Sequence, residues 1–275
     1  MKVGIHLPQF GRAAGPEAIA RAAKQAEDLG YADVWVSDHI VRPAAQNYPS
    51  PMLYDPLMTL TFAAAVTERI GLGTSVLVAP QHNPLWLAKA LATLDVLSKG
   101  RVVAALGAGW SKGEFDALGL PFTDRGARMD EIIDILRAAW GPDPVAFSGQ
   151  FWEFDDLLVL PKPDHQIPLW IGGASDRAFR RTKEKGDGYQ ALGLSIESAP
   201  AMVQRVRADH PEESFTISLR TGWDAQGMEP DQIRREYDAW QAAGVQHVVS
   251  APWRSSMDEW LRSVELLAEI VHPGQ

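Results

Sequence analysis

Val34-Trp35-Val36-Ser37-Asp38-His39 is the stretch that most constrains the fold of this 275-residue chain. A short apolar run that ends on polar residues is typical of a buried parallel strand. In α/β barrels the carboxyl ends of the strands carry the chemistry. A histidine there can act as an acid or a base near neutral pH. Asp38 and His39 are therefore candidate catalytic residues, although a turn-forming Asp and a loop-packed His would give the same pattern.

The rest of the chain alternates between strand and helix on both sides of this stretch. A (β/α)8 TIM barrel of about 250 residues fits as a single domain over residues 1–275. A doubly wound open sheet is the alternative. The other predicted strands are 3–7, 70–77, 101–106, 168–171, 188–192, 214–219 and 246–250. The predicted helices are 16–29, 56–68, one that starts at 84 with Asn83 as its N-cap, 127–140, 176–185, 197–207, 230–243 and 257–271.

Two segments interrupt this alternation. Residues 41–55 contain three prolines and are too proline-rich for a helix, so they predict a functional loop. Residues 142–168 predict an insertion before the fifth barrel strand, with a small hairpin formed by 145–147 and 151–154. Both segments are candidates for shaping a substrate pocket.

Composition excludes several classes of function. The net charge of −9 argues against a nucleic-acid partner. The chain has no cysteine and its seven histidines are scattered, so no metal site is expected. No signal region precedes the first strand, and no apolar run reaches the ~20 residues that span a bilayer. The sequence therefore predicts a cytoplasmic protein with a small-molecule substrate and no membrane partner.

Glycine-rich turns follow two predicted strands. Gly172-Gly173-Ala174-Ser175 precedes a helix, and such a turn lets the backbone and the helix N-terminus bind a phosphate. A tight turn with Ser175 as N-cap is an equally good interpretation. Gly107-Ala108-Gly109 is a weaker signal, because it lacks the full dinucleotide-binding fingerprint. A phosphate anchor without a metal points to an organic cofactor.

Aromatic residues gather at predicted strand and loop ends. Phe10, Trp110, Trp223 and Trp253 could form the wall of an aromatic or apolar pocket, although tryptophan often simply fills a core. His6 faces the barrel interior by strand alternation. It is either a substrate-pocket residue or a hydrogen-bonded core histidine.

Short motifs in a fixed order resemble the bacterial luciferase-like superfamily, and within it the branch that uses the deazaflavin coenzyme F420. The motifs run from the N-terminus to about Tyr189, and the last third of the chain matches only in its strand–helix rhythm. They include residues 4–11, 34–39, 54–57, 67–77, 91–98, 107–110, 125–128, 161–163, 170–173 and 186–189.

This resemblance implies a flavin-type ring held across the strand ends of the barrel. It implies a non-proline cis peptide at Ser75–Val76, Asp38 near the ring, and His39 as the proton-transferring residue. A homodimer is also implied. The cofactor residues expected on this basis are Asp38, Thr74, Ser75, Val76, Gly107, Gly109, Gly172, Gly173, Ala174, Ser175, Leu192 and Gly193.

One departure bears on the substrate. The family's sugar-phosphate dehydrogenase has a Glu as proton donor where this chain has Trp110, and the loop after residue 192 lacks the lysine expected to hold a sugar phosphate. A more apolar substrate is therefore expected, in a pocket of His6, Phe10, Trp110, Trp223 and Trp253.

Four functions follow from this reading. The first is hydride transfer between F420 and an organic substrate. The second is an FMN-dependent monooxygenase that uses reduced flavin and oxygen. A cofactor carrier without turnover and a metal-free lyase are the others. The acidic tail of F420 should prefer a basic rim, for which Lys112, Arg177, Arg180 and Arg181 are candidates.

Overall fold

A computed structural model describes residues 1–272 and forms a closed barrel of eight parallel strands. Strand β1 (Lys2–His6) pairs with both β2 (Asp33–Val36) and β10 (His247–Ser250), which closes the ring. Between them lie, in order, β3 (Gly71–Val78), β4 (Val102–Gly107), β7 (Leu169–Gly172), β8 (Gly188–Leu192) and β9 (Thr216–Thr221). The predicted TIM barrel is confirmed, and closure excludes the open sheet.

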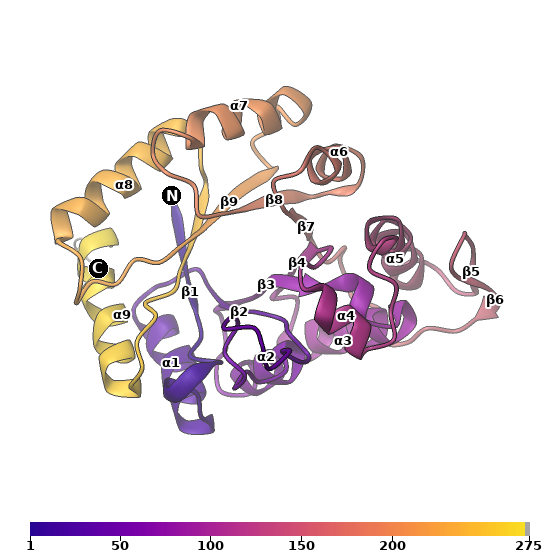
Figure 1. Ribbon diagram of the computed structural model, residues 1–275, viewed down its shortest axis with the longest axis horizontal. Helices are drawn as coiled ribbons and strands as arrows, with labels where there is room; N and C mark the ends of the chain where they lie inside the picture. Colours follow the sequence, from indigo (N-terminus) through magenta and orange to yellow (C-terminus); the bar gives the residue numbers. More distant parts are fainter. Residues whose placement is uncertain (273–275) are drawn as a thin grey trace.

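Helices surround the barrel (Figure 1). The N-cap predicted at Asn83 is present, because its side chain accepts hydrogen bonds from the backbone N–H groups of Leu85 and Trp86. The short helix α4 (Lys112–Ala117) and two 3-10 turns, η1 (Gly11–Ala13) and η2 (Ala79–Gln81), have no counterpart in the prediction. The long helices are α1 (Pro16–Asp28), α2 (Pro56–Ala64), α3 (Pro84–Ser98), α5 (Arg125–Trp140), α6 (Asp176–Lys185), α7 (Ala199–Asp209), α8 (Pro230–Ala243) and α9 (Met257–Val271).

The predicted insertion is a two-stranded antiparallel hairpin, β5 (Val145–Ser148) and β6 (Glu153–Leu157). It lies between α5 and β7 in the chain, and Figure 1 shows it at the periphery, beyond α5. It is therefore separate from the barrel sheet.

Large side chains fill the barrel interior below the strand ends. Trp35 and Trp170 stack with their ring centroids 5.3 Å apart. Glycines on neighbouring strands make room for them, because a Cβ at Gly73 or Gly188 would lie 2.4 Å from an indole atom. The barrel is thus a packed core, and its chemistry is confined to one end.

A buried Ser–His–Asp array lies in the same interior layer. Ser218 Oγ lies 2.7 Å from His247 Nδ1, and His247 Nε2 lies 2.9 Å from Asp33 Oδ1. Ser218 has no exposed surface, so a substrate cannot reach it. The array satisfies polar groups inside the core.

Strand β3 contains an irregularity at its carboxyl end. Its register with β4 shifts between Thr74 and Leu77, and the Ser75–Val76 peptide is cis, as expected from the resemblance. None of the helices within residues 1–272 is long and apolar enough to cross a membrane.

Candidate active site

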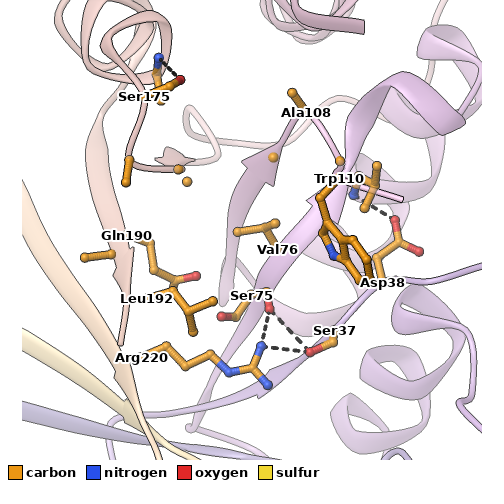
Figure 2. Close-up of a pocket in the computed structure, with 18 of the residues that line it drawn as sticks. Ser37, Asp38, Ser75, Val76, Ala108, Trp110, Ser175, Gln190, Leu192 and Arg220 are labelled. Carbon is orange, nitrogen blue, oxygen red and sulfur yellow. Dashed lines mark hydrogen bonds between the residues drawn. The ribbon is translucent and has the colours of Figure 1, made fainter. Parts of the chain in front are cut away.

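A cavity of about 390 Å³ opens at the carboxyl ends of β2, β3, β4, β7, β8 and β9. In Figure 2, Asp38 and Trp110 lie on one side of it, Gln190 and Leu192 on the other, and Val76 between them. The structure brings most of the predicted site residues together here, and their roles remain predictions. Those that line the cavity are Asp38, His39, Ser75, Val76, Gly107, Gly109, Trp110, Gly172, Gly173, Ala174, Ser175 and Leu192.

The irregular end of β3 forms part of the cavity wall, and it is accommodated by glycines on the adjacent strand β4 and on β7, the next strand beyond it. A Cβ at Gly107 would lie 2.5 Å from Val76 Cγ2, and one at Gly172 would lie 2.8 Å from Val76 Cγ1. Such distances are too short for carbon–carbon contact. These two glycines are therefore needed for Val76, whether or not a ligand approaches them.

Asp38 and His39 are neighbours in sequence but point to different partners. Asp38 Oδ2 accepts hydrogen bonds from the backbone N–H of Val78 (2.9 Å) and from His82 Nε2 (2.7 Å). Burial opposes protonation of His82, but the hydrogen bond and the charge of Asp38 outweigh it and raise the pKa of His82. Asp38 is thus one half of a buried carboxylate–imidazole pair, and its Oδ1 has no hydrogen-bond partner within residues 1–272.

His39 forms a second carboxylate–imidazole pair, with Glu114. The distance from His39 Nδ1 to Glu114 Oε2 is 3.0 Å, and Glu114 also accepts from the backbone N–H of Ile40 at 2.7 Å. Burial acts to raise the pKa of Glu114, but the hydrogen bond and charge of His39 and the hydrogen bond from the Ile40 backbone lower it below its ordinary value. Glu114 therefore stays ionised at neutral pH, and it binds His39 through Nδ1 and not through Nε2.

Aromatic rings enclose His39 at the cavity mouth. Trp110 contacts the His39 ring edge to face at 5.8 Å, and Tyr48 stacks on Trp110 at 6.1 Å. Tyr48 belongs to the proline-rich segment 41–55, which thus reaches the cavity as predicted for a functional loop. The apolar ring surfaces favour an apolar group next to His39.

The predicted phosphate site lies at the N-terminus of α6. Ser175 caps this helix by accepting from the backbone N–H of Ala178 at 3.2 Å, so the N-cap interpretation holds alongside the ligand one. Two guanidinium groups, of Arg125 and Arg181, line the cavity. Of the expected basic rim only Arg181 does so, and its guanidinium also pairs with Asp130 at 2.5 Å. The cavity lining does not include Lys112, Arg177 or Arg180.

Arg220, on β9, reaches the inner end of the cavity. Its Nη1 donates to Ser37 Oγ (2.9 Å) and to the carbonyl oxygen of Ser75 (2.6 Å), as Figure 2 shows. His6 lies beneath this contact, with Nε2 2.8 Å from Ser37 Oγ. Burial, and then the charge of Arg220, lower the pKa of His6 well below its ordinary value, so His6 is neutral.

Several predicted site residues lie outside the cavity. Trp223 is wrong as a substrate-pocket residue: it is fully buried, stacks on Trp240 and donates to Glu236. Thr74 is also fully buried and donates to the carbonyl oxygen of Ala105. His6, Phe10, Trp253 and Gly193 do not line it either. A small aromatic group beside the cavity is formed by His6, Phe10 and Trp253, because the loop after β10 carries Trp253 towards Phe10.

The sequence analysis missed Glu114, His82, Gln190 and Arg220. Glu114 and His82 do not line the cavity, but they bind the lining residues His39 and Asp38. They lie on short elements, α4 and the residue after η2, that carry no clear periodicity. The sequence did contain a signal for Arg220. Strand alternation places it on the same face as Ser218, and an arginine facing a barrel interior requires an explanation.

The sequence model of luciferase-like monooxygenases matches residues 1–259. The chain belongs to the luciferase-like monooxygenase family. The F420-dependent glucose-6-phosphate dehydrogenase of Kineococcus radiotolerans is 30% identical to this chain. The match covers 80% of this chain and 62% of the dehydrogenase. The chain thus spans less than two thirds of that relative. An uncharacterised protein of Mycobacterium tuberculosis is 29% identical over 98% of both chains.

Other members of the family differ in their cofactor. The FMNH2-dependent dimethylsulfone monooxygenase of Pseudomonas fluorescens is 35% identical over 56% of this luciferase-like chain and 43% of its own length. Among solved structures, a monooxygenase of Streptomyces bottropensis superposes with a TM-score of 0.85 at 21% identity, covering 99% of both chains. An F420-dependent secondary alcohol dehydrogenase superposes with a TM-score of 0.82 at 18% identity, covering 98% of both. At such identities the structures establish the shared fold.

Proposed function

We propose that this protein is an oxidoreductase that transfers a hydride between coenzyme F420 and a small, fairly apolar organic substrate. The observation that carries the proposal is the His39–Glu114 pair, which places an imidazole with one bound and one available nitrogen at the mouth of a cavity that Trp110 encloses. Relatives named as F420-dependent dehydrogenases support this choice of cofactor.

The polar groups of the cavity fit a flavin-type ring. The pyrimidinedione edge of such a ring presents two carbonyl oxygens and one N–H between them. Three buried polar atoms of cavity-lining residues lack a partner in the described chain: the acceptor Asp38 Oδ1 and the donors Gln190 Nε2 and Arg220 Nε. Buried polar groups normally have a partner, so a ligand with complementary groups is expected there.

The cofactor's phosphate would be held at the other end of the cavity. Residues 173–175 lead into α6, whose first backbone N–H groups have no partner within the helix. Arg125 and Arg181 add two guanidinium groups near this point. Asp176 in the first turn opposes an anion, but Arg205 binds its carboxylate at 2.7 Å.

F420, when bound, supplies two-electron hydride transfer. In the proposed reaction His39 Nε2 takes the proton from an alcohol oxygen, or returns it to a carbonyl oxygen in the reverse direction. Glu114 holds the Nδ1 proton of His39 and compensates the positive charge that forms on the imidazole. Trp110 packs against His39 next to that contact, and Tyr48 stacks on Trp110.

Glucose 6-phosphate is not proposed as the substrate. Trp110 stands where the sugar-phosphate dehydrogenase carries its proton-donating Glu, and the Glu114 carboxylate four residues later is buried and bound to His39. The loop that follows Leu192 provides no lysine for a sugar phosphate. An apolar substrate suits the ring surfaces better.

A monooxygenase that uses reduced FMN is the second candidate. The relative from Pseudomonas fluorescens favours it. The two functions differ in their need for oxygen. With F420 and a panel of small alcohols under nitrogen, the proposed function predicts loss of the oxidised cofactor's visible absorbance. Oxygen uptake on mixing with reduced FMN and no such loss with F420 would favour the monooxygenase.

We also propose that the protein forms a homodimer. Exposed apolar side chains gather on α2 and α3, which pack side by side. A surface of this kind is typical of protein interfaces. The residues concerned are Met58, Phe62, Trp86, Val96 and Leu97.

A further inference from the structure

Arg220 is a buried cation without an acidic partner. Its side chain is only 8% exposed, and no carboxylate within residues 1–272 forms a salt bridge with it. Its recorded hydrogen-bond acceptors are the neutral oxygens of Ser37 and Ser75. The Trp253 ring lies 5.5 Å from the guanidinium carbon and adds a weak cation–π contact.

The charge of Arg220 persists despite its burial. Burial lowers the pKa of Arg220 to about 10, which is still well above neutral pH. His6 beneath it is neutral, as shown above, and so contributes no negative charge. A buried charge is costly unless it is paired. The inner end of the cavity therefore carries an uncompensated positive charge.

A second unpartnered donor lies next to Arg220. Gln190, on the adjacent strand β8, is 3% exposed and lines the cavity, and its Nε2 has no partner among the described residues. In Figure 2 Gln190 and Arg220 lie on the same side of the cavity, opposite Asp38. The β8–β9 wall thus offers two donors and one positive charge, while the opposite wall offers an acceptor.

We propose that Arg220 and Gln190 bind the anionic, two-electron-reduced form of the ring cofactor and make the protein select it over the oxidised form. This inference rests on the proposed function only because it requires a ring cofactor. That cofactor can be either F420 or FMN. Uptake of a hydride adds two electrons and one proton to the ring, which then carries one extra negative charge until it binds a second proton. Arg220 compensates that charge, and Gln190 donates to a ring oxygen.

Anaerobic titration with oxidised and with reduced F420, followed by cofactor fluorescence and repeated with FMN, tests this directly. We expect the wild type to bind the reduced form more tightly. Arg220→Gln should weaken binding of the reduced form about tenfold or more and of the oxidised form less than about threefold, because one charge-assisted contact is lost. A tenfold loss of preference for the reduced form over the oxidised form corresponds to a midpoint potential lowered by about 30 mV for a two-electron couple.

Two further variants separate the loss of the Arg220 charge from a general loss of cofactor binding. Arg220→Lys keeps the charge and should retain most of the preference for the reduced form. Arg125→Gln removes a guanidinium from the phosphate end of the same cavity and should weaken both redox forms equally. Equal weakening of both forms by Arg220→Gln, or no weakening of either, would overturn the proposal.

The wild type alone provides a second test, which stands even if Arg220→Gln does not fold. A pH titration followed by cofactor absorbance shows where the reduced cofactor takes up its second proton. When bound, the cofactor should remain anionic down to about one pH unit below the range in which the free cofactor is protonated. Ionisation over the same range as in solution would contradict the proposal while leaving hydride transfer intact. If neither F420 nor FMN binds, both the proposed function and this inference are wrong.

Discussion

At the residue scale, the chemistry of this site depends on partners that are distant in sequence. Asp38 and His39 read as one pair in the sequence, yet Asp38 binds His82 and His39 binds Glu114. The proposed role of His39 thus depends on a carboxylate 75 residues away. We therefore expect Glu114 to act as a positioning residue, because it is buried and binds the imidazole.

Substitutions at this pair should separate turnover from binding. His39→Ala should lower turnover by about 10²–10⁴, the usual contribution of a general base, and change the Kd for the cofactor little. Glu114→Gln should lower turnover about tenfold and move the acid limb of the pH–rate profile to lower pH, because the imidazole loses its carboxylate. Turnover, the pH profile and cofactor Kd are the measurements.

Glu236→Gln is the control for this pair. It removes a carboxylate that binds Trp223 outside the cavity, and it should leave turnover and the pH profile unchanged. An equal loss of turnover and cofactor binding in His39→Ala would contradict the assigned role. An unshifted pH profile in Glu114→Gln would contradict the positioning role.

His6 should make stability fall as the pH falls below about 6.5. Burial and Arg220 lower its pKa in the folded state, so in this window the unfolded chain binds more protons than the folded chain. The free energy of unfolding should then decrease by up to about 1.4 kcal/mol per pH unit until the folded-state pKa is reached.

Urea denaturation between pH 7 and pH 5 measures this slope. In His6→Gln the dependence should be shallower over that range than in the wild type. His82 has a raised pKa and acts in the opposite direction above about pH 6.5, so it does not obscure the window. Parallel slopes in the two proteins would show that His6 is protonated equally in both states.

At the element scale, the end of β3 is the feature that shapes the cavity. Val76 fits only because β4 and β7 end in glycines, so Gly107 and Gly172 belong to the packing of the strands. From the sequence both were expected in the cofactor site, Gly107 because of the family resemblance and Gly172 also because a glycine turn at a strand end is typical of a phosphate site. Sequence alone could not separate these two requirements.

Gly107→Ala should therefore damage the site even before a ligand is present. The new Cβ would meet Val76 Cγ2 at 2.5 Å, and overpacking of this kind costs about 1–3 kcal/mol of stability. The displaced Val76 should also weaken cofactor binding. Gly15→Ala is the control, because a Cβ there meets no atom within 4 Å and Gly15 is extended. Equal behaviour of both variants in denaturation and titration would refute this reading.

The long elements were predictable, and the short ones were not. The eight strands, the hairpin insertion and the cap at Asn83 follow from apolar patterning and turn residues. Helix α4 has six residues, too few for a periodic pattern, and Glu114 lies on it. Trp223 ends up in the core because the chain after β9 turns its ring towards α8, which no local pattern records.

At the scale of the whole molecule, the exposed apolar surface of α2 and α3 should be an interface. Phe62→Glu, alone or with Leu97→Glu, should shift the protein from dimer to monomer in size-exclusion chromatography with light scattering. Leu158→Glu is the matched control, because Leu158 is also an exposed leucine but lies after the hairpin. A wild type that is monomeric at micromolar concentration would remove the proposed dimer. The single domain and the cytoplasmic location also stay predictions.

The central claim is that the cavity serves F420, and one measurement tests it most directly. The purified protein is titrated with F420 and, separately, with FMN, and cofactor fluorescence is followed. The account predicts micromolar or tighter binding of F420 and weaker binding of FMN. Preference for FMN would contradict the cofactor assignment and favour the monooxygenase, whereas binding of neither would leave the barrel intact and remove the function proposed for it.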